Sequence, residues 1–455
     1  MNHFKITLDN IQHIQHLEYD IDLSKNTLHC IVGKNGVGKT TLIKAIENFK
    51  DATALDKLSR LNIVNTSSSL KFVIDDKHIT FTPTEDDGRY VLDTTEDIAK
   101  ELKEDIFTEL PLPKGKRFDL FQKLGGSVGD TIKAQFSLSV YDDEPTELIE
   151  LFRSVYGDDR FSTLKQIDVG GEKYYIKPLN EENYLREDDF SSGEYMIVQI
   201  YKLMQKKCKL IVIDELDISL DSSAQVKLLG VLRKLARSYE SNLVFTTHSL
   251  AIMKSMPDSL YYMETTHTTT TIERKSYNYI KSLLFQFEGY DKIILTEDKM
   301  LVGYVNYLLR DEQKLFCKYK IIHIAGHSQT VDLMERNAQM NFLGTEGVIS
   351  LLDGDQRGTV IYQERDDIIF IPFESVEKDL YQSYIDGGLD AIIDGRDIDI
   401  NSINLANKLK KKASALYHSI IDRRYMSDED IFNFVNDGYK EDVEALKAKL
   451  VVFLT

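Results

Sequence analysis

The chain has 455 residues, of which 42% are hydrophobic and 29% charged, and its formal net charge is −18. This length predicts two or three domains with substantial cores. The acidic balance excludes a surface that is basic throughout, although a local positive groove could still bind nucleic acid. No apolar run approaches the ~20 residues that cross a bilayer, and "MNHFKITLDN" lacks the features of a secretory signal.

The cysteines Cys30, Cys208 and Cys317 are widely separated and form no CxxC pair. This spacing argues against disulfides or a zinc knuckle and favours a reducing compartment. We therefore expect a cytoplasmic protein without membrane association.

In chain order, "LHCIVG" predicts a buried strand and "TLIKAIENF" opens a helix. Residues 60–180 are mixed: "LKFVIDDKHITFTP" and "KAQFSLSVYD" indicate antiparallel strands, and "EDIAKELKEDIF" indicates a helix. Residues 190–255 alternate apolar strands with helical patterns, as a layered α/β domain does. The threonine-rich "METTHTTTTIERKS" predicts a closing hairpin.

After "FQFEGY" a new strand, "DKIILTE", begins, and α/β alternation continues to the end of the sequence. We therefore place a domain boundary near residues 275–288. The prediction is an α/β domain over 1–280, with an inserted arm at about 60–180, and a smaller α/β domain over 285–455.

A phosphate-binding loop is predicted at "GKNGVGKT", which fits G-x-x-x-x-G-K-[ST] and has a strand before it and a helix after it. Backbone N–H groups of such a loop surround phosphates, and the helix N-terminus adds positive potential. Lys39 would reach the β- and γ-phosphates, and Thr40 would bind Mg²⁺. The residues expected at ATP are Gly33, Lys34, Asn35, Gly36, Val37, Gly38, Lys39, Thr40 and Thr41.

The strand "KLIVIDELD" ends in Asp214 and Glu215. Such a strand can present one acid to Mg²⁺ and the next to an attacking water. We therefore expect Asp214 to bind the metal and Glu215 to be the catalytic base.

Two further segments complete this pattern. "FSSGEYMIVQIYKLM" places Ser191, Ser192 and Gly193 at the start of a helix, and "LVFTTHSLAI" ends a strand in Thr247 and His248. His248 could touch a γ-phosphate or be structural. Asp221, in the loop between these segments, is also expected at the ATP site.

The order of these motifs resembles the ABC-type ATPases, which include transporter motors, chromosome-maintenance heads and DNA-repair heads. The resemblance implies that two heads sandwich ATP head to tail, with Ser192 and Gly193 meeting the γ-phosphate of the other copy. "SSGE" departs from the commonest "SGGQ", and for the Q-loop glutamine there are only two candidates, Gln122 and Gln135. About 150 residues separate the phosphate loop from the serine–glycine motif, and a compact insertion in that interval is similar to that of the OLD (overcoming-lysogenization-defect) family.

A second group of acids follows residue 288. Glu297 ends the strand "DKIILTE", "IIHIAGHS" is a strand ending in Gly326, and "VISLLDGD" ends in Asp353 and Asp355. Parallel strands would bring these acids to one edge, where they could bind a hard cation such as Mg²⁺ or Mn²⁺.

This pattern resembles the Toprim domain of topoisomerases, primases and OLD nucleases. The resemblance implies that Glu297, Asp353 and Asp355 hold the metal, joined by Glu377 or, as a second choice, Glu374. Two positions depart from the family, because Asp298 stands in place of a glycine and Leu301 in place of an acid. We expect a loop at "DGRDID" (394–399). The basic segment with Lys408–Lys412, Arg423 and Arg424 is either a phosphate contact or a solvated helix face.

The whole resembles an OLD-family ATP-dependent endonuclease of bacterial anti-phage defence. The resemblance implies ATPase and DNA endonuclease activities, a homo-oligomer built on head-to-tail dimers, and DNA as a partner. A reverse transcriptase with its DNA–RNA product (a retron), or another defence protein, is a further candidate partner. The alternatives are an ATP-gated sensor or scaffold with a degenerate Toprim site, and a DNA-repair head that does not cut. A transporter motor ranks last.

Overall fold

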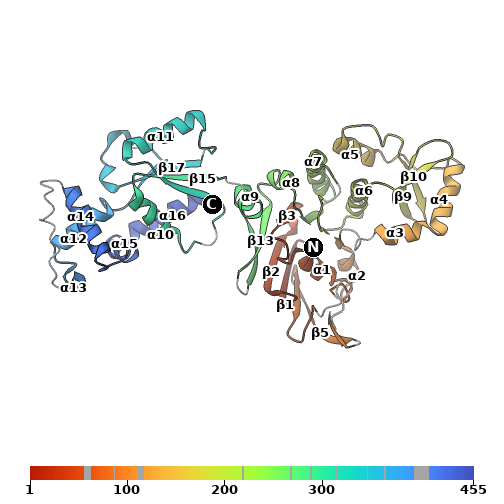
Figure 1. Ribbon diagram of the computed structural model, residues 1–455. Helices are drawn as coiled ribbons and strands as arrows, with labels where there is room; N and C mark the ends of the chain where they lie inside the picture. Colours follow the sequence, from red (N-terminus) through yellow and green to blue (C-terminus); the bar gives the residue numbers. More distant parts are fainter. Residues whose placement is uncertain are drawn as a thin grey trace. The chain divides into compact units, whose positions relative to one another are not determined.

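The computed structural model divides the chain into two compact units, Met1–Ile280 (unit 1) and Lys281–Thr455 (unit 2) (Figure 1). Both units alternate strands with helices, so the predicted α/β class is confirmed. The structure describes residues 1–55, 63–86, 88–110, 117–217, 220–266, 269–286, 289–312, 315–345, 347–362, 365–393 and 409–455.

Unit 1 is built on an eleven-stranded mixed sheet with the order β6-β5-β4-β1-β2-β14-β13-β3-β12-β11-β7. The strands are β1 (His3–Ile11), β2 (Ile14–Asp22), β3 (Leu28–Val32), β4 (Ser69–Ile74), β5 (Lys77–Asp86), β6 (Arg89–Asp93), β7 (Ile106–Glu109), β11 (Leu210–Ile213), β12 (Asn242–Thr246), β13 (Leu260–Thr266) and β14 (Thr269–Arg274). The predicted hairpin is the antiparallel pair β13–β14.

One half of this sheet is parallel. β3 pairs with β12, β12 with β11 and β11 with β7, all in parallel. Every described residue of β11 and β12 is buried, which explains their continuous apolar sequences. The carboxyl ends of these four strands therefore share one edge of the sheet, where α/β folds bind ligands.

Helix α1 (Lys39–Glu47) packs on the large sheet through its apolar face. Phe49, just after α1, forms an aromatic cluster with Phe72 and Phe81 of the antiparallel half, with ring centroids 4.9 and 6.4 Å away. The helices of unit 1 are α1 (Lys39–Glu47), α2 (Lys100–Glu104), α3 (Arg117–Leu124), α4 (Ser127–Ser137), α5 (Thr146–Tyr156), α6 (Ser192–Gln205), α7 (Ser222–Ser238), α8 (Leu250–Lys254) and α9 (Tyr277–Phe285).

A separate lobe of unit 1 carries a three-stranded sheet of order β10-β9-β8, formed by β8 (Lys165–Val169), β9 (Glu172–Pro178) and β10 (Tyr184–Arg186). Figure 1 shows α3 and α4 lying beside β9 and β10. Leu124, Ile132 and Phe136 of these helices share a core with Ile167 and Tyr174. Because β4 to β7 belong to the large sheet, this lobe is smaller than the predicted arm over 60–180.

One prediction within that arm is wrong, and a second holds only in part. "KAQFSLSVYD" was expected to be a strand, but its first half lies in α4, because Ile132 and Phe136 are four residues apart and face the lobe core together. "EDIAKELKEDIF" forms only the short helix α2, and its end enters β7, where Ile106 is buried in the core of unit 1.

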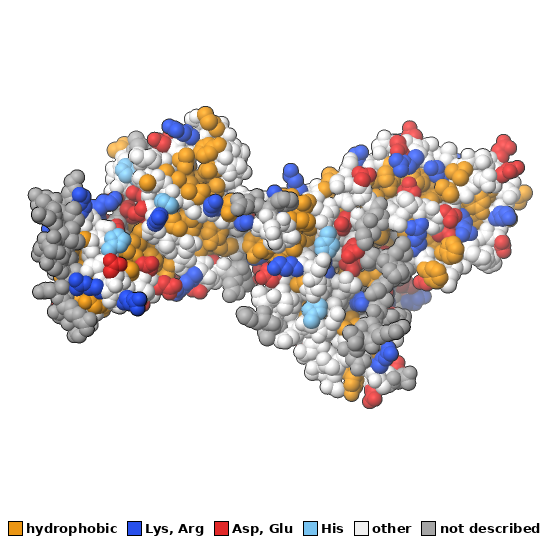
Figure 2. Space-filling model, viewed as in Figure 1, with side chains coloured by type: hydrophobic (Ala, Val, Ile, Leu, Met, Phe, Trp, Pro, Cys, Tyr) orange, Lys and Arg blue, Asp and Glu red, His pale blue; other side chains and the backbone are white. Residues whose placement is uncertain are grey.

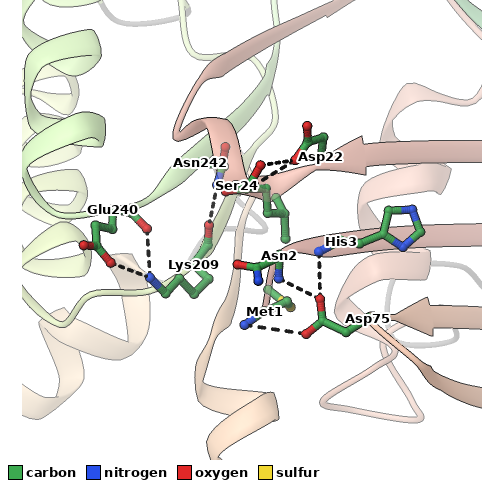
Figure 3. A network of polar contacts seen from close by, with 10 residues as sticks. Met1, Asn2, His3, Asp22, Ser24, Asp75, Lys209, Glu240 and Asn242 are labelled. Carbon is green, nitrogen blue, oxygen red and sulfur yellow. Dashed lines mark hydrogen bonds and ion pairs between the residues drawn. The ribbon is translucent and has the colours of Figure 1, made fainter.

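The N-terminus is held by Asp75, in the turn between β4 and β5. The Asp75 carboxylate accepts backbone N–H groups of Asn2 and His3 at 2.7 and 2.9 Å, and pairs with the Met1 amino group at 3.7 Å (Figure 3). Two backbone hydrogen bonds lower the pKa of Asp75. The Asn242 amide donates to the Lys209 carbonyl at 3.4 Å (Figure 3), which joins the ends of β11 and β12.

Unit 2 contains a four-stranded, fully parallel sheet of order β16-β15-β17-β18. Its strands are β15 (Lys292–Thr296), β16 (Tyr319–His323), β17 (Gly347–Leu352) and β18 (Ile368–Phe370). Its helices are α10 (Lys299–Leu309), α11 (His327–Met340), α12 (Val376–Ile385), α13 (Asp390–Ile393), α14 (Leu409–Asp422), α15 (Asp428–Asn436) and α16 (Lys440–Leu454). Leu301 and Leu416 lie in one shared core.

The three cysteines are buried, and none of them is joined to another in a disulfide. Within the described residues, no helix is both long and apolar enough to span a bilayer. The predicted loop at 394–399, and Lys408 of the basic segment, lie outside the described residues.

Candidate functional site

The loop between β3 and α1 depends on glycine. Gly36 and Gly38 have φ angles of 79° and 108°, in the left-handed region that favours glycine. A Cβ at Gly33 would lie 2.5 Å from the Met263 carbonyl oxygen, and one at Gly38 would lie 2.7 Å from Ile14 Cδ1. Glycine is therefore required at Gly36 by its left-handed backbone conformation and at Gly33 by the lack of room for a Cβ. Both reasons apply at Gly38.

Lys39 curls back onto this loop. Its side chain is buried, and Nζ donates to the carbonyl oxygens of Gly33 at 2.8 Å and Lys34 at 3.2 Å. Burial lowers the pKa of Lys39, and the charges of Asp214 and Glu215 oppose this effect. The ammonium is therefore held by neutral acceptors, and the phosphates of ATP would offer it charged ones.

Asp214 and Glu215 meet this loop from the end of β11. The Thr40 hydroxyl donates to Asp214 Oδ2 at 2.7 Å, and the buried Thr246 hydroxyl donates to Asp214 Oδ1 at 2.5 Å. Thr246 Oγ1 also accepts the backbone N–H of Glu215 at 2.8 Å. Glu215 has a φ of 54°, so this hydrogen bond holds its backbone in the left-handed conformation. The structure thus brings Thr40, Asp214 and Glu215 together, with Thr246 between the acids.

Other residues predicted at ATP lie around this centre. Lys34 and Asn35 are exposed and Val37 is half-buried. Thr41 is buried and donates to Gln12 Oε1 at 2.6 Å, so its hydroxyl is used within the fold. Asp221 caps α7 by accepting the N–H groups of Ser223 and Ala224.

His248 follows β12 at the same edge of the sheet. Its side chain is exposed, and its backbone N–H donates to the Asp217 carboxylate at 3.3 Å. Glu109, at the end of β7, is buried in register with Ile213, beside Asp214. Glu109 was not predicted from the sequence, although its place at the end of the strand Ile106–Glu109 was a usable signal. The two glutamine candidates, Gln122 and Gln135, lie instead on α3 and α4 of the lobe.

The predicted serine–glycine motif starts α6. Ser191 is the N-cap, and it forms a reciprocal capping box with Glu194. Ser192 is half-buried and accepts a hydrogen bond on its hydroxyl from Arg117 Nη1 at 3.2 Å. Arg117 comes from α3 of the lobe, and no motif in the sequence marks it.

In unit 2, Glu297 and Asp353 follow the adjacent parallel strands β15 and β17. Both are buried, at 7% and 8% exposure, and the Asp353 backbone N–H donates to Glu297 Oε1 at 3.0 Å. Burial raises the pKa of Glu297. Burial, followed by the charge of Glu297, raises the pKa of Asp353 to about 8. These two acids form a buried pair that resists carrying two negative charges.

The other predicted metal ligands have partners of their own. Asp355 pairs with Lys378 Nζ at 2.6 Å, and Glu374 pairs with the same ammonium at 3.3 Å. Burial raises the pKa of Glu377, opposed by a hydrogen bond from Ser414. Within the described residues, no three His, Cys, Asp or Glu side chains are gathered closely enough to hold one ion.

The two departures from the expected pattern have structural roles. Asp298 caps α10 by accepting the Leu301 N–H at 3.0 Å. Leu301 is 1% exposed and packs in the core of unit 2. Beside the acids lies a pocket of about 510 Å³, lined by Asp298, Glu377, His323, His418 and Tyr417 among others. The charge of Lys410, on α14, acts on both Asp353 and Glu377.

Comparison with known proteins identifies the class of unit 1. Residues 4–124 match the model described as "AAA ATPase domain", and residues 105–254 match "AAA domain, putative AbiEii toxin, Type IV TA system". Neither match extends past residue 254 into unit 2.

Among curated proteins, the chain is 24% identical to the phosphonates import ATP-binding protein PhnC of Lactobacillus johnsonii, over 53% of this chain and 77% of that protein. It is also 24% identical to the oligopeptide transport ATP-binding protein OppF of Mycoplasma genitalium, over 33% of this chain but only 18% of that protein.

Among solved structures, the SMC head domain from Thermotoga maritima aligns with 60% of this chain and 98% of that chain, at 16% identity and a TM-score of 0.34. The SmcHead bound to the C-winged helix domain of ScpA aligns with 59% of this chain and 96% of that chain, at 15% identity and a TM-score of 0.40. With the phosphate loop and its paired acids, the two family matches identify residues 4–254 as an ATP-binding domain of the ABC/AAA ATPase type.

Proposed function

We propose that the chain is an ATP-controlled, metal-dependent DNA endonuclease. Unit 1 binds and hydrolyses ATP, and unit 2 cuts phosphodiester bonds at the acids that follow β15 and β17. The observation that carries the nuclease half is the buried contact between Glu297 and Asp353 at the carboxyl edge of a parallel sheet. A buried acid pair is costly for a fold, and it is therefore a candidate for function.

In unit 1 the proposed chemistry follows from three contacts. Lys39 is aimed at the loop that would surround the phosphates. Thr40 and Asp214 are already joined and would both face Mg²⁺. Glu215, held by Thr246, would orient and deprotonate the attacking water. His248 would contact the γ-phosphate from the end of β12.

The second half of the ATP site would come from another copy. Ser192 and Gly193 start a helix whose N-terminus suits an anion. We propose that two copies of the chain enclose ATP head to tail, so that ATP binding brings the copies of the homo-oligomer together.

In unit 2 the proposed ligands Glu297, Asp353 and Asp355 are oxygen donors of the kind that hard cations take. As they stand they are not gathered closely enough to hold one ion, so binding would require Asp355 to leave Lys378 and join the buried pair. Mg²⁺ or Mn²⁺, when bound, would offset their repulsion and supply a Lewis acid for phosphodiester hydrolysis. Glu377 and Lys410 stand on neighbouring helices, where they could add a ligand and a phosphate contact. On the face shown in Figure 2, Lys and Arg of the described residues are scattered among acids, so DNA affinity would rest on local contacts.

A defence role is proposed from the same resemblance. A nuclease that is held in check by ATP would be toxic when released, and the description of the second matching model also names a putative toxin. Phage DNA would be the target, and a retron reverse transcriptase with its DNA–RNA product, or another defence protein, would be the partner.

A second candidate is an ATP-gated scaffold that holds a toxic partner. Two observations favour it: Asp355 is neutralised by Lys378, and Leu301 occupies the place of an acid in the core. A DNA-repair head without nuclease activity is a weaker alternative, since it gives the pair Glu297–Asp353 no role.

The test is cleavage of supercoiled and linear DNA with Mg²⁺ or Mn²⁺, with and without ATP. The wild type is compared with Asp353→Ala and with Asp386→Ala, which removes an exposed acid of the same unit. Metal-dependent nicking that is lost only in Asp353→Ala supports the nuclease. No cleavage under any condition, with ATP hydrolysis intact, supports the scaffold.

A further inference from the structure

Arg117 is the residue that joins the lobe of unit 1 to the start of α6. We call residues 188–195 the signature segment. The guanidinium of Arg117 donates to the Asp188 carbonyl at 2.8 and 3.3 Å, to the Phe190 carbonyl, and to the Ser192 hydroxyl at 3.2 Å. It also lies over the Tyr195 ring, 5.0 Å from the centroid. One side chain therefore touches the signature segment at four residues.

The contacts of Arg117 do more than hold the signature segment in place. Asp188 and Phe190 accept through their backbone carbonyls, and any donor group of suitable geometry could supply those two hydrogen bonds. The planar guanidinium provides that geometry, because its five donors form a rigid fork. Ser192, however, is the residue expected to meet a γ-phosphate, and the Arg117 charge lies next to its hydroxyl. A phosphate oxygen that bonds this hydroxyl would stand close to the same charge.

Among the described residues that contact the Arg117 guanidinium, none places a carboxylate on it. Asp188 presents its carbonyl to Arg117, while its carboxylate pairs with Arg186 Nη2 at 2.7 Å. Glu194 is used in the capping box with Ser191. The partners of the guanidinium are thus two carbonyls, a hydroxyl and an aromatic face, all of them neutral, and an anion would be a stronger acceptor.

We propose that Arg117 sets the signature segment for ATP bound to a second copy of this chain and brings its positive charge to the γ-phosphate there. This inference rests on the head-to-tail dimer of the proposed function. It adds a residue of the lobe to the ATP site, and it means that the lobe positions the part of one head that reads the nucleotide of the other. An arginine that acts in trans on a γ-phosphate contributes ~10³–10⁵ to kcat in other nucleotide hydrolases.

The test uses the full chain with Glu215→Gln, which slows hydrolysis so that ATP-bound dimers accumulate. Arg117→Ala, Arg117→Gln, Arg117→Lys and the exposed control Arg153→Ala are added to this parent. Two quantities are measured: the affinity of single heads for a fluorescent ATP analogue at high dilution, and the ATP-dependent dimerisation constant by analytical ultracentrifugation.

We expect Arg117→Ala to leave the ATP affinity of single heads within about twofold and to weaken dimerisation by about tenfold or more, as loss of a charge-assisted contact does. Arg117→Lys keeps the charge without the fork, so its dimerisation should be intermediate and more sensitive to salt. Arg153→Ala should match the parent.

Other outcomes overturn the inference. Dimerisation of Arg117→Ala within twofold of the parent would exclude a role in trans. An equal loss of ATP affinity in single heads would place the effect within one copy. If Arg117→Ala does not fold, Arg117→Gln decides, because it removes the charge but keeps amide donors, and dimerisation within twofold of the parent would exclude the role in trans. A parent that stays monomeric with ATP would overturn the proposed dimer itself.

Discussion

Thr246→Val tests whether one buried hydroxyl holds the two acids of the ATP site. Valine has nearly the same shape as threonine, so the change removes the hydroxyl and leaves the packing of β12 in place. Thr246 is 2% exposed; its hydroxyl donates to Asp214 at 2.5 Å and accepts the Glu215 N–H at 2.8 Å. Both contacts disappear in the variant.

The expected cost follows from those two contacts. A hydrogen bond to a charged group contributes about 1.5–3 kcal/mol, and a donor left without its acceptor costs at least about 1 kcal/mol more. A total of about 3 kcal/mol would lower the melting temperature of a unit of this size by about 6 °C. Hydrolysis should fall by ~10²-fold, since a misplacement of about 1 Å at a catalytic group has that effect.

The assay combines calorimetry without nucleotide with steady-state ATP hydrolysis. Thr246→Ser is the matched control, because it keeps the hydroxyl and should retain most of the hydrolysis rate. A Thr246→Val protein that melts within 1 °C of the wild type and hydrolyses ATP at the wild-type rate would refute the role assigned to Thr246.

Three further predictions concern the glycine loop and unit 2. Gly38→Ala should weaken binding of a fluorescent ATP analogue more than Gly36→Ala does, because both positions have a positive φ that strains alanine but only the Cβ at position 38 also meets a neighbour, Ile14, at 2.7 Å; equal losses would contradict the steric argument. Leu301→Asp should lower the melting temperature of unit 2 by more than about 5 °C, since it buries an acid in the core, and a stable variant that binds Mn²⁺ more tightly would contradict this. Burial raises the pKa of Asp353 to about 8 in the metal-free folded chain, against an ordinary 3.8. The folded state therefore keeps the proton more tightly than the unfolded state, so the contribution of Asp353 to the free energy of unfolding is highest at low pH and falls as the pH rises from 3.8 through 8. The melting temperature of Asp353→Asn should therefore fall less than that of the wild type between pH 4 and pH 8, and parallel curves would show that the group titrates normally.

The sequence predicted those parts of the fold that are set by short-range patterns. The loop from Gly33 to Thr40 has a glycine at each place that needs one, so its strand–loop–helix setting could be predicted from local chemistry alone. The strand ahead of Asp214 was predictable because it is buried on both faces and therefore continuously apolar.

What the sequence could not give depends on contacts between distant segments. Arg117 and Ser192 are 75 residues apart, and no periodicity links them. The same holds for Lys378, which neutralises Asp355 from a different helix. Helix α4 was misread because the alternation of Phe136, Leu138 and Val140 resembles a strand, while its packing uses Ile132 and Phe136.

The strand order of unit 1 also determines when the ATP site can form during synthesis. β3 carries the phosphate loop, but its neighbour β12 follows much later, and the Thr27 N–H bonds an Asn242 side chain 215 residues downstream. At ~5–20 residues per second, a ribosome needs roughly 10–40 s to make that stretch. For that time the apolar strand Leu28–Val32 leaves the ribosome without its partners on the β12 side. The contact from Thr40 to Asp214, which joins the phosphate loop to β11, can likewise form only after Asp214 has emerged.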